Sequence, residues 1–96
     1  MLIDSCASGG RRNDLETLRR AVPLLRSDYI MEPVGNQGHT YGLSSWIPYY
    51  GQGVYYRDEQ LEYNVRSHFC PALGLGIDVR QPGIDWPRFT KLLAEW

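Results

Sequence analysis

The sequence has almost no lysine, few cysteines and no long apolar run. Lys91 is its one lysine, and nine arginines complete ten basic residues against eleven acidic ones, for a net charge of −1. A chain so close to neutrality lacks the positive surface that nucleic acid or anionic lipid attracts. No apolar segment approaches the roughly 18 residues that span a bilayer. The sequence therefore predicts neither a nucleic-acid partner nor a membrane partner.

Cysteine and histidine are equally scarce. Cys6 and Cys70 cannot build a disulfide framework, and with His39 and His68 they do not give a metal-ligand pattern. We expect two free thiols, no metal and no cofactor. His68 falls on a predicted helix and is expected to be hydrogen-bonded in place, whereas His39 falls in a predicted loop where it could touch a substrate. The start of the chain also lacks the basic region of a signal peptide, so the compartment is not indicated.

What is present indicates a folded domain. Hydrophobic residues make up 43% of the chain and aromatic residues 12%, which is too much for a disordered segment. A chain of 96 residues has the length of one small domain.

The first half of the chain predicts two strands and one helix. Leu2 and Ile3 form a short strand that runs into a turn rich in small residues. Asn13 or Asp14 caps a helix with an apolar stripe of Leu15, Leu18 and Val22, and Pro23 ends it. Residues 24–28 form a second strand, and the glycine-rich segment 29–43 is a long loop with at most one helical turn.

The second half predicts two further strands and two helices. Residues 43–50 form a strand, and Asp58 caps a helix over 59–69 with Leu61, Val65 and Phe69 on one face. Residues 72–77 form the last strand, and Asp85 caps a final helix. The predicted buried face of that helix comprises Phe89, Leu92, Leu93 and Trp96.

This alternation predicts an α/β fold with parallel strands and right-handed crossovers. Four such units are about half of a (β/α)8 barrel of ~250 residues. Polar residues support a partial TIM barrel over a doubly wound sheet, because they lie at or just past the predicted carboxyl ends of strands, where barrel active sites form. They are Asp4, Cys6, Asp28, Tyr49 and Asp78.

Three features are candidates for a site, and each also has a plain structural interpretation. Residues 5–14, with Gly9 and Gly10, could bring backbone N–H groups close to an anion or be an ordinary strand-to-helix turn. Asp28 could be a general acid with a pKa raised by desolvation, or an ion-pair partner of an arginine. An aromatic run could line a sugar site or simply pack between strand and helix; it comprises Trp46, Tyr49, Tyr50, Tyr55 and Tyr56.

The segment Cys6-Ala7-Ser8-Gly9-Gly10-Arg11-Arg12-Asn13-Asp14, followed by Ser27-Asp28, resembles glycoside hydrolase family 36, the retaining α-galactosidases. That family carries Cys-x-Ser-Gly-Gly-Gly-Arg-x-Asp after barrel strand five and Ser-Asp at the end of strand six. Arg11 stands where the family has a third glycine, which indicates a divergent branch.

The resemblance implies a role for each matching residue. Cys6 and Gly9 would contact the galactose ring, Arg12 and Asp14 would brace the turn, and Asp28 would be the general acid/base. Trp46, from the aromatic run and not from the family motif, is a further candidate for binding the substrate. The expected ligand is a terminal α-galactoside or a related oligosaccharide.

The same resemblance implies that the chain is part of a larger site. The family nucleophile is an aspartate in a Lys-x-Asp pattern at the end of strand four, and no lysine precedes Lys91 here. We therefore expect that the chain is the C-terminal half of the barrel, strands five to eight, and that Met1 is an internal or truncated start. Such a fragment needs the N-terminal half and would be marginally stable and inactive alone. Two alternatives stay open: a non-catalytic carbohydrate- or phosphate-binding module that uses the Gly9-Gly10 turn, and a purely structural βα fragment.

Overall fold

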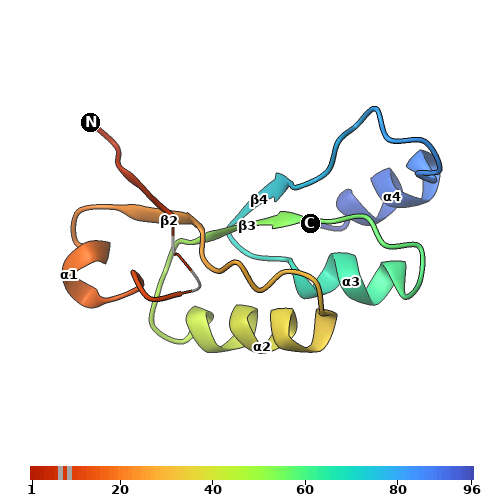
Figure 1. The fold of residues 1–96 in the computed structure, drawn as a ribbon. Helices are drawn as coiled ribbons and strands as arrows, with labels where there is room; N and C mark the ends of the chain where they lie inside the picture. The colour runs from red at the N-terminus through yellow and green to blue at the C-terminus, as the bar shows by residue number, and fades with distance from the viewer. Residues whose placement is uncertain (7, 9) are drawn as a thin grey trace.

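Four βα units follow one another along the chain (Figure 1). A computed structural model describes residues 1–6, 8 and 10–96. The strands are β1 (Asp4–Cys6), β2 (Val22–Leu25), β3 (Gly51–Val54) and β4 (Ala72–Leu75). The helices are α1 (Leu15–Leu18), α2 (Pro33–Ser44), α3 (Leu61–Ser67) and α4 (Trp86–Leu93). No helix in these described ranges is long and apolar enough to cross a membrane.

The strands form two parallel pairs. β1 pairs with β2 in a register that places Cys6 opposite Leu25, and β3 pairs with β4 from Gly51 opposite Ala72 onward. The amide of Arg26, just past β2, donates to the carbonyl of Gly51 at 3.1 Å and so links the two pairs. The described residues thus form two two-stranded parallel sheets and no closed barrel, and the half-barrel assignment stays a prediction.

The predicted loop over 29–43 is wrong, because most of it is helix α2. The Glu32 carboxylate caps this helix by accepting from the amides of Val34 (2.7 Å) and Gly35 (2.6 Å), and Pro33 occupies its first turn. Glycine inside a helix costs about 1 kcal/mol relative to alanine. Gly35 is nevertheless needed in this helix, because a Cβ at that position would collide with the Tyr29 ring.

The strand predicted over 43–50 is also wrong. Leu43 and Ser44 end α2, and the third strand is the glycine-rich β3, which composition disfavours as a strand. The close packing of β3 between β2 and β4 explains why a glycine-rich segment forms this strand. A Cβ on Gly51 would lie 2.6 Å from the Leu24 carbonyl oxygen and 3.0 Å from that of Ala72, so only glycine fits there.

The helix-cap predictions have mixed outcomes. Asp14 and Asp85 cap α1 and α4 as expected, but α3 starts at Gln60 in a left-handed conformation (φ 57°), not at Asp58. Val22 and Pro23 lie in β2 and not at the end of α1, because α1 is only one turn long.

The apolar core lies between β3, β4 and the last two helices. Its fully buried members are Val54, Leu61, Val65 and Phe89, with Leu92 beside them. Trp96, predicted to join this face, is 59% exposed, and its indole N–H donates to the Cys70 carbonyl at 2.8 Å.

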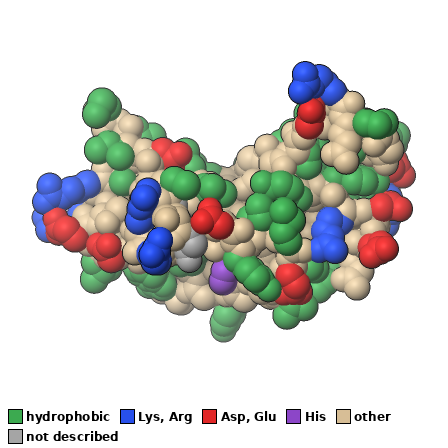
Figure 2. All heavy atoms as spheres, viewed as in Figure 1, with side chains coloured by type: hydrophobic (Ala, Val, Ile, Leu, Met, Phe, Trp, Pro, Cys, Tyr) green, Lys and Arg blue, Asp and Glu red, His purple; other side chains and the backbone are tan. Residues whose placement is uncertain are grey.

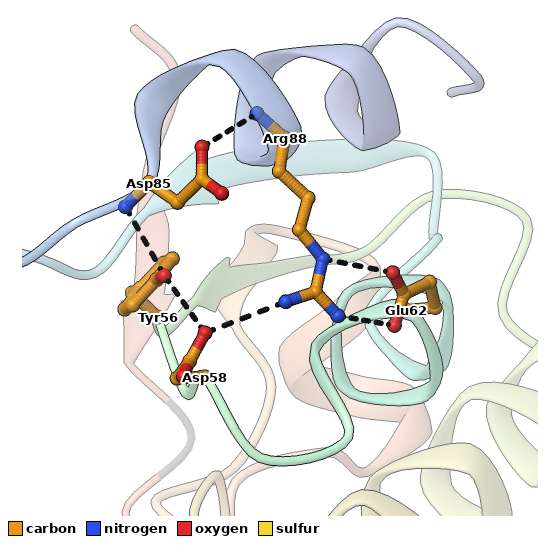
Figure 3. A network of polar contacts seen from close by, with 5 residues as sticks. All are labelled: Tyr56, Asp58, Glu62, Asp85 and Arg88. Atoms are coloured by element: carbon orange, nitrogen blue, oxygen red, sulfur yellow. Dashed lines mark hydrogen bonds and ion pairs between the residues drawn. The ribbon is translucent and has the colours of Figure 1, made fainter.

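A polar network fixes α4 against α3 (Figure 3). Arg88 donates to both carboxylate oxygens of Glu62, at 2.9 and 2.8 Å, and reaches Asp58 at 3.4 Å. The Tyr56 hydroxyl donates to Asp58 and accepts from the amide of Asp85. Because the ion pairs are partly exposed, they orient the helices more than they stabilise the fold.

Helices α2 and α3 cover one side of the strands (Figure 1). Figure 2 shows the molecule hollowed on the opposite edge, between the N-terminal segment and the loop after β4. Leu2, Leu24 and Leu75 are exposed. Within the described residues, the outer edges of β1 and β4 pair with no further strand.

A second, polar core lies between β2, α2 and the end of α3. Asn36 joins the residues of this polar core. Its Oδ1 accepts from Arg26 Nη2 at 3.1 Å. Its Nδ2 donates to the Ile30 carbonyl at 3.3 Å and to His68 Nε2 at 2.7 Å. His68 Nδ1 lies 2.7 Å from the Asn64 carbonyl. The network therefore assigns the proton of neutral His68 to Nδ1 and leaves Nε2 as an acceptor. This confirms that His68 is hydrogen-bonded in place.

Burial lowers the pKa of His68, and the nearby charge of Arg26 lowers it further, against the Asn64 hydrogen bond. The unfolded chain therefore binds more protons than the folded one below about pH 6.5. We expect the contribution of His68 to the free energy of unfolding to be complete above that pH. It should fall as the pH drops toward the pKa of His68 in the folded state. The slope from this one group is at most about 1.4 kcal/mol per pH unit. Urea unfolding of wild type and His68→Gln between about pH 7.5 and 5.5 tests this, and equal slopes in the two proteins would contradict it.

Candidate functional site

The predicted site residues lie at the carboxyl ends of β1 and β2. Cys6 is the last residue of β1, and it lies opposite Leu25, the last residue of β2. Asp28 comes three residues after Leu25. Because the two strands are parallel, their carboxyl ends meet at one edge. Asp4 and Tyr49, by contrast, lie at the amino ends of β1 and β3, so the prediction that they share this edge is wrong.

The turn after β1 is held by its own side chains. Arg12 Nη1 donates to the Cys6 carbonyl at 3.1 Å, and the Asp14 carboxylate accepts from the Thr17 amide at 2.9 Å and the Thr17 hydroxyl at 3.1 Å. These Thr17 hydrogen bonds lower the pKa of Asp14. Gly10 adopts a left-handed conformation (φ 93°), which glycine accommodates without strain. Gly9, assigned to the sugar site, lies outside the described residues.

Asp28 is exposed, so the desolvation expected for its carboxyl group is not provided by the described part of the chain. The alternative interpretation, an ion pair with Arg26, also fails. Arg26 is fully buried and directs Nη2 to Asn36, and the ion pairs among described residues do not include Asp28. The Asp28 carboxylate is therefore free to meet a ligand.

A cavity of about 220 Å³ lies between the β1–α1 turn, β2 and α2. Ser27, directly before Asp28, lines it, and Trp46 stands beside it with its side chain half-exposed. His39 also lines it, from α2 and not from a loop, with its ring edge-on to Tyr29 at 5.6 Å between centroids. Asn13 and Arg26 complete the polar lining. Asn13 was predicted only as a possible helix cap, and Arg26 only as a possible ion-pair partner of Asp28. An arginine at the end of an apolar strand is the signal that could have marked Arg26 as a site residue.

The aromatic run does not form one wall. Trp46 and Tyr49 line a second cavity of about 330 Å³ against α1, while Tyr50 is buried beside Ile47 and Cys70. Tyr56 packs edge-on against Phe89. Packing between elements therefore explains Tyr56 and most of the Tyr50 ring, although Tyr50 also lines a separate cavity. Trp46 and Tyr49 are exposed rings of the run that border open space.

Both cysteines are free thiols, as expected, with Cys6 exposed and Cys70 buried. Burial raises the pKa of the Cys70 thiol. No group of three potential metal ligands occurs among the described residues. Comparisons of the chain with family models, curated proteins and solved structures gave no match.

Proposed function

We propose that this chain supplies the general acid/base and part of the sugar-binding wall of a retaining α-glycosidase that acts on terminal α-galactosides. One observation carries the proposal: the parallel pairing of β1 with β2 brings the Cys6 end and the Ser27-Asp28 end to one edge, beside the cavity bordered by Trp46. Barrel enzymes place their reacting groups at that edge.

In this mechanism Asp28 first protonates the leaving glycosidic oxygen, and a second carboxylate attacks the anomeric carbon. Asp28 then takes a proton from the water that hydrolyses the glycosyl intermediate. The two carboxyl groups must lie about 5–5.5 Å apart, and the proposal assigns the nucleophile to a segment outside this sequence. The exposure of Asp28 fits a carboxyl group that such a segment would cover.

The remaining residues would hold the sugar. The exposed Cys6 thiol lies at the end of β1, and the half-exposed Trp46 ring offers a flat apolar face next to polar groups, as ligand sites commonly do. Arg12 and Asp14 keep the intervening turn in place through the hydrogen bonds described above.

The two cysteines provide a test of sugar binding with an internal control. We expect methyl α-galactoside to slow the alkylation of exposed Cys6 by iodoacetamide and to leave buried Cys70 unaffected, as measured by mass spectrometry of the intact chain and its peptides. Trp46→Ala should weaken this protection about tenfold, the loss that corresponds to ~1.4 kcal/mol.

Tyr41→Ala is the matched control, because Tyr41 is an 82% exposed ring on α2 and should leave the protection unchanged. Alkylation of Cys6 at the same rate with and without the galactoside would argue against the proposed sugar site.

A further inference from the structure

The cavity between the β1–α1 turn and α2 contains a concentration of polar atoms without partners. Six buried side-chain nitrogen or oxygen atoms in the described part of the chain have no hydrogen-bond partner. Four of them belong to residues that line this one cavity: Arg26 Nε and Nη1, His39 Nδ1 and Asn13 Oδ1. Because buried polar groups are nearly always hydrogen-bonded, this clustering points to a ligand.

Arg26 is the strongest of these groups. Its side chain is fully buried, yet no carboxylate of the described residues forms an ion pair with it. Its contacts are the backbone and side-chain oxygens of Asn36, at 3.2 and 3.1 Å, and the Tyr50 ring, 5.5 Å from the guanidinium carbon. Burial of a charge without an opposite charge is costly. A bound anion would remove that cost and accept from one of the unpartnered donors, Nε–H or Nη1–H.

We propose that this cavity binds a small oxyanion, a carboxylate or phosphate group, with the Arg26 guanidinium as its main donor. A guanidinium N–H that donates to an anionic oxygen forms a strong, charge-assisted hydrogen bond. The Asn13 side chain is held by donation from its Nδ2 to the Arg26 carbonyl at 2.9 Å, which leaves its Oδ1 to accept from a ligand hydroxyl. His39 Nδ1 provides a further polar contact, and a volume of about 220 Å³ suits a small ligand. The inference does not depend on the proposed glycosidase function.

The test follows Arg26 itself by NMR in the ¹⁵N-labelled chain. We expect the Arg26 Nε–Hε signal to shift saturably when inorganic phosphate or galacturonate is added, at concentrations well below those that neutral galactose requires. Saturation by phosphate alone identifies free phosphate as the better ligand, and saturation by galacturonate alone identifies an acidic sugar. Either result supports the site. An Arg26 signal that moves with neither anion up to about 50 mM, far above a millimolar dissociation constant, would overturn it.

Variants locate the binding. Arg26→Lys keeps the charge and removes the Nε–H and Nη1–H donors. Its affinity, followed by the backbone amide signal of Ser27, which lines the cavity, should fall at least about tenfold, equivalent to ~1.4 kcal/mol. Arg80→Lys is the matched control, since Arg80 is highly exposed and pairs with Asp78. Should Arg26→Lys fail to fold, His39→Leu leaves Arg26 in place and is expected to weaken binding severalfold. Equal affinities in His39→Leu, Arg80→Lys and wild type would place the anion elsewhere and overturn the proposal.

Discussion

Replacement of Asp28 by Asn is expected to lower the hydrolysis of methyl α-galactoside by about 10²–10⁴-fold, the usual effect of losing a general acid/base. The measurement uses a polypeptide in which this chain is joined to the proposed N-terminal half barrel, which would carry the nucleophile. The amide is isosteric with the carboxylate but can neither protonate the leaving oxygen nor activate water. Since Asp28 is exposed and forms no ion pair among the described residues, the substitution should leave the fold intact.

The leaving group separates this role from simple binding. A 4-nitrophenyl α-galactoside needs little protonation to depart, so Asp28→Asn should impair the first step much less for this substrate than for the methyl glycoside. Glu59→Gln, the same chemical change at another exposed carboxylate, should leave both rates unchanged. Undiminished hydrolysis of the methyl glycoside by Asp28→Asn would remove Asp28 from its assigned role.

Replacement of Asn36 by Ala is expected to lower the free energy of unfolding by about 3 kcal/mol. Asn36 is fully buried and provides hydrogen bonds to both Arg26 and His68. Alanine would leave a guanidinium N–H and an imidazole nitrogen without these partners inside the protein, and it would also open a cavity. Urea unfolding followed by tryptophan fluorescence measures the change.

The neighbouring residue is the control for Asn36. Gln37 lies on the same helix but is exposed, and its side-chain oxygen accepts from the Tyr63 hydroxyl at 2.7 Å. Gln37→Ala should change stability by no more than about 0.5 kcal/mol. A loss of less than about 1 kcal/mol for Asn36→Ala would show that the polar core contributes little.

Local sequence signals predicted the features that depend on residues close together in the chain. Asp14 and Asp85 identified the starts of α1 and α4 because a capping carboxylate binds amides within the same turn. Leu61 and Val65 identified the buried face of α3 because they are four residues apart. The Arg12 contact with Cys6 also lies within one turn.

The errors occurred where distant residues decide the structure. Gly35, Gly38 and Gly42 suggested a loop over what is helix α2. That helix is held by the Glu32 cap and by contacts such as Asn36 with His68, 32 residues apart. The position of β3 depends on Gly51 fitting closely against Leu24 and Ala72, which no local propensity encodes.

By itself, then, the sequence determined the order of the strands and helices other than α2 and β3, the two free thiols and the residues expected at the ends of β1 and β2. Only the tertiary structure decided that Arg26 is buried with no ion-pair partner among the described residues, and that Asn13, His39 and Trp46 border the same cavity. The physical reason is that caps and apolar periodicity act over a few residues. Burial and the pairing of charges are set by segments that meet only when the chain has folded.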